Sequence, residues 1–88
     1  SATLNLASQQ VFRVSATSNR VLSFSNAPGP GRAMTVVIRL TGSNGTITWP
    51  SGIIWDEGAA PELRDSWTAV ALLWDGIHWY GFVSGGAD

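Results

Sequence analysis

Hydrophobic and polar residues alternate with a period of two along most of this chain, which is the pattern of β-strands with one buried face. The clearest stretch is "AMTVVIRLT", residues 33–41. One face of this stretch would carry Met34, Val36, Ile38 and Leu40. The opposite face would carry Thr35, Val37 and Arg39. We therefore expect a strand whose first face lies in the core.

Similar alternation recurs on both sides of this stretch. Before it, the residues expected on one face are Leu4 and Leu6 in "LNLA", Phe12 and Val14 in "QVFRVS", and Leu22 and Phe24 in "RVLSF". After it come the strand-like segments "TITW", "GIIW", "WTAVALLWD" and "IHWYGFV". No stretch combines helical spacing with helix caps. The pattern predicts an all-β fold, a small antiparallel β domain of about seven short strands.

The Asp75-Gly76 step lies between two of these segments and is typical of a two-residue hairpin loop of type I′. Such a loop would pair Trp74 with Ile77, Leu72 with Trp79 and Val70 with Gly81 on one face of the hairpin. On the other face it would pair Leu73 with His78, Ala71 with Tyr80 and Ala69 with Phe82. Both faces are apolar or aromatic, although a sheet in a monomer usually leaves one face polar. We therefore expect a second subunit or a neighbouring protein to cover the second face.

Composition narrows the class of protein. The 88 residues make one domain, which we expect to span residues 1–84, with the glycine-containing end 85–88 as a flexible tail. The chain has no cysteine, so disulfides and cysteine-bound zinc are excluded. A small core and a charged fraction of only 12% favour oligomerisation as the source of additional stability.

Charge and hydropathy argue against two kinds of partner. The net charge is −1, without the basic stripe of a nucleic-acid-binding protein. No apolar run approaches the roughly 18 residues of a membrane-spanning helix. The first residues, "SATLNLASQQ", lack the basic and apolar regions of a signal peptide. We expect neither a nucleic-acid partner nor a membrane partner.

Residues capable of catalysis are sparse. His78 could act as a general base near Asp75, but no nucleophile motif accompanies it, and we interpret it as a histidine packed on a sheet. The acidic residues of the region after the second tryptophan are Asp56, Glu57, Glu62 and Asp65. Their spacing does not match a calcium-binding loop, so a solvated loop is the simpler interpretation. We expect no enzymatic activity, no catalytic residue, no metal site and no cofactor.

Aromatic residues are the most unusual feature of the composition. The five tryptophans are Trp49, Trp55, Trp67, Trp74 and Trp79. Aromatic rings cover sugar rings well, and they also supply the largest buried area per residue in cores and subunit interfaces. We expect packing or oligomer contacts for all five, together with Tyr80 and Phe82. Trp55, in "TITWPSGIIWDEGAAP", is also the candidate glycan contact.

The order of these motifs resembles a module that recurs in virion proteins of tailed bacteriophages, often at the C-terminus of tail-fibre proteins. The matching positions are Phe24 to Asn26, Pro28, Thr46 to Pro50, Ile54, Trp55, Gly58, Pro61, Leu63, Asp75, Gly76 and Trp79 to Phe82. The segment "LNLASQQVFRVSATSN" resembles the opening strand pair of the same family, so the resemblance covers nearly the whole chain. The chain departs from the family at Asn5, commonly Asp, at Ile77, where the family has a longer "DGG" turn, and at its "GGAD" end.

This resemblance implies a non-enzymatic structural component on the surface of a phage particle, assembled as an intertwined homotrimer. Its partners would be sister copies and other virion proteins, such as capsid or fibre subunits. A capsid-decoration (cement) protein and a tail-fibre domain both fit the resemblance. The alternative is a carbohydrate-binding module of a tail fibre that recognises host surface glycans.

Overall fold

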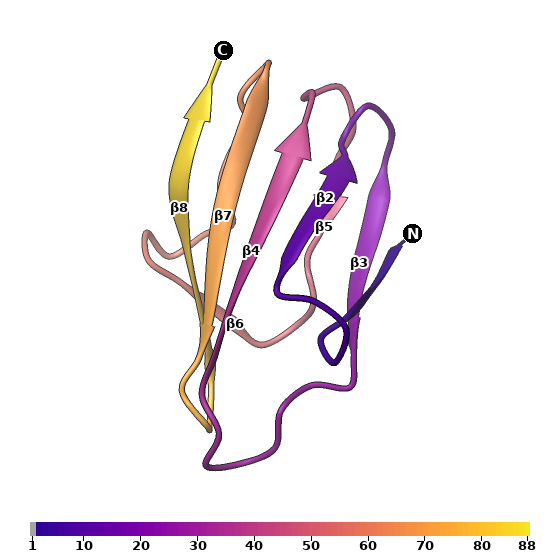
Figure 1. Cartoon of the computed structure of the whole chain (residues 1–88). Helices are drawn as coiled ribbons and strands as arrows, with labels where there is room; N and C mark the ends of the chain where they lie inside the picture. Colours follow the sequence, from indigo (N-terminus) through magenta and orange to yellow (C-terminus); the bar gives the residue numbers. More distant parts are fainter. Residues whose placement is uncertain (1) are drawn as a thin grey trace.

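The computed structural model describes residues 2–88, and within this range the chain forms eight β-strands and no helix (Figure 1). The strands are β1 (Ala2–Asn5), β2 (Val11–Ser15), β3 (Arg20–Ser25), β4 (Met34–Thr41), β5 (Ile47–Thr48), β6 (Ile53–Trp55), β7 (Trp67–Trp74) and β8 (Trp79–Ala87). The all-β prediction is confirmed, with one strand more than expected. Pro50 follows β5 closely, and a proline cannot donate to a continuing ladder.

The strands form two sheets, one in the order β1-β3-β5 and one in the order β2-β4-β7-β8-β6. From β1 to β6 the chain passes from one sheet to the other after every strand. The neighbours β1/β3, β3/β5 and β2/β4 are therefore each separated in sequence by one strand of the other sheet. This winding makes β1/β3, β3/β5 and β2/β4 parallel pairs. β6 and β8 are also parallel.

The prediction of an antiparallel domain is therefore wrong for most of the described strand pairs. Only β4/β7 and β7/β8 are antiparallel among residues 2–88. Figure 1 shows β8, β7, β4 and β2 side by side as the main layer of the molecule. Hydrophobic alternation fixes which face of a strand is buried, but it does not specify the direction of the neighbouring strand.

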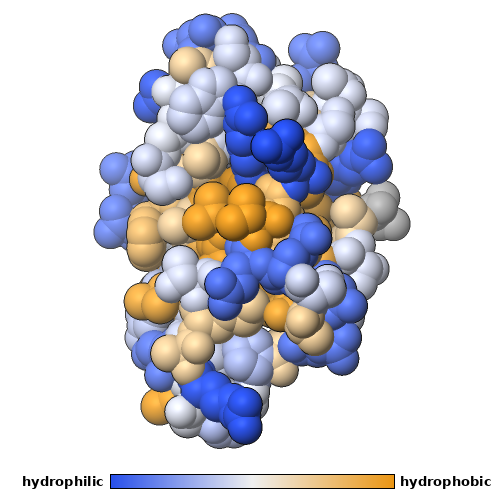
Figure 2. Space-filling view, viewed as in Figure 1, coloured by the Kyte–Doolittle hydropathy of each residue, from blue (hydrophilic) through white to orange (hydrophobic). Residues whose placement is uncertain are grey.

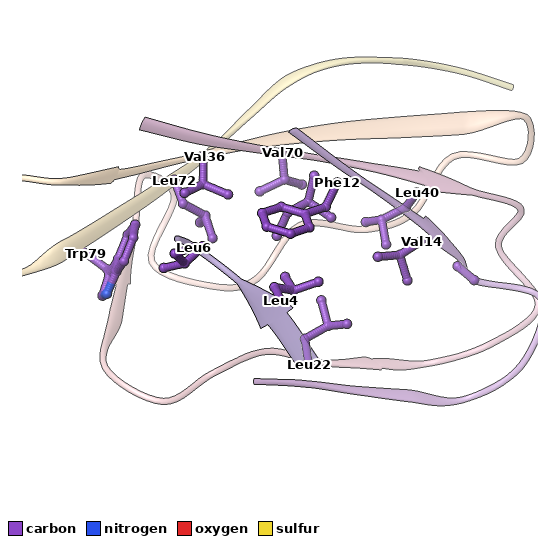
Figure 3. Close-up of a cluster of buried hydrophobic side chains, with 12 residues drawn as sticks. Leu4, Leu6, Phe12, Val14, Leu22, Val36, Leu40, Val70, Leu72 and Trp79 are labelled. Atoms are coloured by element: carbon purple, nitrogen blue, oxygen red, sulfur yellow. The ribbon is translucent and has the colours of Figure 1, made fainter. Parts of the chain in front are cut away.

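The core lies between the two sheets, where the alternating residues predicted from the sequence meet (Figure 3). The small sheet contributes Leu4 and Leu22, and the segment that follows β1 contributes Leu6. The large sheet contributes Phe12, Val14, Val36, Ile38, Leu40, Val70 and Leu72. Trp79 closes one end of this cluster (Figure 3). The predicted core faces of β1 to β4 are confirmed.

The loop between β7 and β8 contains four residues, not two. Trp74 lies opposite Trp79, and Leu72 lies opposite Gly81. The partners on β8 are thus shifted by two residues from those predicted. Side chains alternate with a period of two along a strand, so this shift leaves the residues of β7 and β8 on their predicted faces, whereas Ile77 and His78 lie in the loop.

The prediction of a flexible tail at residues 85–88 is wrong for residues 85–87, because β8 continues to Ala87. Gly85 pairs with Ala69, and Ala87 pairs with Trp67. The register changes by one residue between Ala69 and Val70, which marks a β-bulge in the strand pair. Residues 85–87 therefore belong to the folded domain.

Candidate functional site

The outer face of the large sheet, which points away from the core, carries a continuous apolar area. Strand register places Val11, Val37, Ala71 and Phe82 in one row across β2, β4, β7 and β8. The adjacent row contains Leu73, Tyr80 and Ile54 on β7, β8 and β6. We call these seven residues the outer apolar face. Register alone brings them together from five strands.

Much of the outer apolar face is open to solvent. The exposed fractions are 60% for Val11, 47% for Ile54, 39% for Phe82 and 37% for Leu73. Figure 2, viewed as in Figure 1, shows hydrophobic side chains gathered in the middle of the visible face, in the region of β4 and β7, with polar side chains above and below. A contiguous apolar area of this kind on a small domain is a candidate interaction surface.

A polar row borders this area on the same face. Arg13 and Arg39 lie opposite each other on β2 and β4. The guanidinium carbon of Arg39 lies 5.5 Å from the centre of the Trp67 ring, within the range of a cation–π contact. Trp67 therefore packs against a charged side chain at the margin of the outer apolar face and lies outside its two rows.

Two tryptophans belong to the core side of the sheet. Trp79 is 8% exposed, and its ring centre lies 4.8 Å from that of Phe24 in the small sheet. Trp74 lies 5.3 Å from Trp79 and donates a hydrogen bond from its indole nitrogen to the carbonyl of Gly29 at 3.3 Å. These contacts connect the two sheets and the proline-glycine loop. Trp74 and Trp79 thus pack within the subunit.

Trp55 and Trp49 form a second aromatic cluster, with ring centres 5.1 Å apart in an edge-to-face arrangement. Trp55 lies opposite Gly81 in the β6/β8 pair. A Cβ atom on Gly81 would lie 2.6 Å from Cε3 and Cζ3 of Trp55, so this part of the indole rests directly on the β8 backbone. The contacts with Trp49 and with the β8 backbone at Gly81 restrict the area of Trp55 that a sugar ring could cover.

The remaining edge of Trp55 lines an open cleft of ≈ 660 Å³ between β8 and the loop after β6. Its apolar lining consists of side chains of Trp55, Leu63, Phe82 and Val83 together with the alanines and proline of the loop. The charged residues that line it are Asp56, Glu57, Glu62, Arg64 and Asp88. The expected solvated acidic loop is thus one wall of a cleft. Asp65 lies outside the lining and accepts a hydrogen bond from Ser43 at 2.8 Å.

The loop between β7 and β8 is held by the Asp75 carboxylate. Its Oδ1 accepts hydrogen bonds from the backbone N–H of His78 at 2.7 Å and of Ile77 at 2.8 Å. These two bonds hold the pKa of Asp75 below its ordinary value of 3.8, and the bond from His78 has the larger effect. His78 is exposed and its ring lies edge-on to Tyr80 at 6.4 Å. The Asp75 side chain therefore stabilises the turn through the backbone of Ile77 and His78.

Within residues 2–88, no group of three or more metal-binding side chains is close enough to hold a metal ion. The same part of the chain contains no helix that could span a membrane. No protein-family model, curated protein or solved structure matches the chain significantly. The outer apolar face and the cleft are the two surfaces on which the proposals below are based.

The sequence predicts part of the outer apolar face but does not predict the cleft. The two apolar faces of the β7/β8 hairpin predicted the contribution of Leu73, Tyr80 and Phe82. Val11 and Ile54 were not predicted there, because their strands join this sheet through parallel pairs. The cleft combines β8 with a loop about 20 residues earlier in the sequence, and no local motif signals that proximity.

Proposed function

We propose that this protein is a non-enzymatic structural component of a bacteriophage virion, located on the particle surface. In this proposal it assembles as a homotrimer through the outer apolar face. It serves as a capsid-decoration protein or a tail-fibre domain and contacts other virion proteins, such as capsid or fibre subunits. The resemblance of the "TWP" and "DGIHWYGF" motifs to phage virion modules supports this class of protein.

The observation that carries this proposal is the exposure of the outer apolar face. Val11, Leu73 and Phe82 lie on three different strands, and each is more than one-third exposed. Burying apolar surface stabilises an interface by roughly 25 cal/mol per Å². Subunit contacts across this face would therefore supply stability that a thin core lacks.

Analytical ultracentrifugation of a Leu73→Lys variant tests the assembly. We expect a trimer for the unchanged chain and dissociation for the variant, because a lysine in the middle of an apolar interface loses its hydration. Val21→Lys is the matched control, since Val21 is a strand valine that is 53% exposed in the small sheet. It should leave the trimer intact.

Two outcomes count against the assembly. The first is an unchanged chain that sediments as a monomer at micromolar concentration. The second is equal dissociation by Leu73→Lys and Val21→Lys. Circular dichroism of both variants separates loss of assembly from loss of folding, because dissociated subunits that retain the β-sheet spectrum have lost only their contacts.

Recognition of a host surface glycan is the second candidate function, and the position of Trp55 on the cleft is the observation that favours it. This candidate predicts that a host polysaccharide quenches tryptophan fluorescence in the unchanged chain and not in Trp55→Leu. It is supported less well than the structural role, because Gly81 and Trp49 already contact the Trp55 ring.

A further inference from the structure

Strand β8 is much longer than the strand that covers its free edge. β6 pairs only with residues Trp79 to Gly81. Beyond this pair, the backbone N–H of Asp56 donates to the carbonyl of Gly81 at 2.8 Å, and the chain then turns away through Gly58, whose φ is 81°. The part of β8 after Gly81 is therefore paired on its β7 side alone among the described strands.

Val83 supplies the first free backbone groups of this edge. Successive residues of a strand direct their N–H and C=O groups to opposite edges. Gly81 uses its carbonyl on the β6 side, so Val83, two residues later, directs its N–H and C=O to the same side. Val83 is 45% exposed, and its backbone makes no hydrogen bond with the loop after β6 in the described part of the chain.

The open edge of β8 forms one side of the cleft of ≈ 660 Å³ described above. Trp55, Phe82 and Val83 offer apolar contacts near it. The charged groups around it are four carboxylates, Asp56, Glu57, Glu62 and Asp88, with the single guanidinium of Arg64. A cleft with this excess of negative charge attracts a cationic ligand.

We propose that the cleft binds an extended, basic peptide segment of a partner protein, which adds to the sheet as a short strand beside β8 in the line of β6. The backbone of the segment pairs with Val83. Its alternate side chains contact the Trp55 and Val83 side of the cleft, and its lysines or arginines face the carboxylates. Added strands of this kind obtain affinity from main-chain hydrogen bonds and specificity from side-chain contacts.

An extended peptide fits these observations better than a compact ligand. Free N–H and C=O groups of a strand edge are a template for another strand. Phe82 belongs to both the outer apolar face and the cleft, but Trp55, Val83 and the carboxylates belong to the cleft alone. The inference therefore rests on groups that lie outside the proposed subunit contact.

Titration with two synthetic peptides tests the proposal. The first, acetyl-Lys-Val-Lys-Val-Lys-Val-amide, has the proposed character, and the second replaces each lysine with glutamate. In ¹⁵N-labelled protein, we expect the basic peptide to shift the Val83 amide resonance and its neighbours on β8. The acidic peptide should produce no shift. The affinity should fall as salt rises, because the carboxylates are at the surface.

Variants separate the backbone contact from the charge contact. Val83→Pro removes the N–H donor, and we expect about a three- to tenfold weaker affinity. Glu62→Gln should weaken basic-peptide binding several-fold while preserving the fold. Asp65→Asn is the matched control, because it removes a carboxylate outside the cleft, and it should bind the peptide like the unchanged chain. If Val83→Pro disturbs the fold, the comparison of peptide affinity between Glu62→Gln and Asp65→Asn alone decides whether the proposal holds.

The proposal is overturned if the two peptides bind equally, if the Val83 amide does not move at saturation, or if Glu62→Gln and Asp65→Asn have the same affinity. It is also overturned if an oligosaccharide shifts these amides and neither peptide does, since the cleft would then be a glycan site. Preference for the basic peptide, with a shifted Val83 amide, supports it.

Discussion

Trp55 lies directly over Gly81, so that a Cβ atom at position 81 would approach two atoms of the indole ring to 2.6 Å. The same Cβ would lie 2.9 Å from Cγ2 of Ile53. The two neighbours come from one strand, β6, and both lie opposite β8. Glycine at position 81 is therefore required for β6 to pack on the sheet.

Gly81→Ala should lower the free energy of unfolding by about 1–3 kcal/mol, because the added methyl group forces the Trp55 ring or the strand to move. Urea denaturation at one fixed protein concentration measures this loss, since self-association would add to the apparent stability. Gly29→Ala is the control, because a Cβ at position 29 has no neighbour within 4 Å. Equal losses for both variants would contradict the packing argument.

Trp79 and Phe82 lie on the same strand, and their opposite orientations give the second prediction. Trp79→Ala removes a side chain that packs against Phe24 and Trp74, and it should cost about 3–5 kcal/mol of folding free energy. Phe82→Ala should cost much less, because Phe82 is 39% exposed on the outer apolar face. Its main effect should be on sedimentation. Urea denaturation and ultracentrifugation of both variants test this division of roles.

Thr68 connects the cleft wall to the core. Its side chain is fully buried, and its Oγ1 accepts a hydrogen bond from the backbone N–H of Arg64 at 2.7 Å. Thr68→Val keeps the shape of the side chain but leaves that N–H without its partner, which should cost about 1–3 kcal/mol. Hydrogen exchange gives the more specific readout. The Arg64 amide should lose protection in Thr68→Val and keep it in Thr68→Ser, and equal protection in the two variants would contradict this assignment.

The buried faces of the first four strands were predictable, because alternation within a strand is a local property. Phe12 and Val14, for example, face the core as their spacing indicates. The choice of neighbouring strands was not predictable in this way. Residues about 20 positions apart, such as Leu4 and Phe24, become parallel partners only because the chain crosses between the sheets. No local pattern carries that information.

The glycines at the end of the chain predict a flexible tail, but the structure places residues 85–87 in β8. Gly85 and Gly86 are instead positions of close approach. A Cβ on Gly86 would lie 2.6 Å from Cδ of Arg64, and a Cβ on Gly85 would lie 3.3 Å from Cη2 of Trp67. Glycine inside a strand commonly marks such an approach. The side chains that cover them come from the loop before β7 and from its first residue, so the sequence at positions 85–88 alone could not indicate a strand.

The β7/β8 loop explains the outcome of the hairpin prediction. The strand residues lie on the predicted faces, but the pairing register is wrong because the loop has four residues and not two. Asp75 accepts two backbone hydrogen bonds, from Ile77 and His78, and thereby stabilises a four-residue loop. These bonds favour the charged carboxylate, so its pKa in the folded protein is lower than in the unfolded chain. The stabilisation is complete above the unfolded pKa of about 4 and is lost as the pH falls through the lower folded value.

Asp75→Asn should retain an acceptor oxygen for the turn but lose the pH-dependent part of this stabilisation. Asp75→Ala should lose both parts. At pH 7 we expect the melting temperature to decrease from the unchanged chain to Asp75→Asn and then to Asp75→Ala. As the pH falls below about 4, the difference between the unchanged chain and Asp75→Asn should shrink, because the unchanged carboxylate becomes protonated.

Melting curves followed by circular dichroism between pH 2 and pH 7 measure these differences at constant ionic strength. Glu57→Gln is the control for removing one negative charge from an exposed loop, and its difference from the unchanged chain should vary less with pH. If the Asp75→Asn difference stayed constant down to the lowest pH, the charge of Asp75 would have no role in the turn. The hydrogen bonds would then act through acceptor geometry alone, and the lowered pKa would make no contribution to stability.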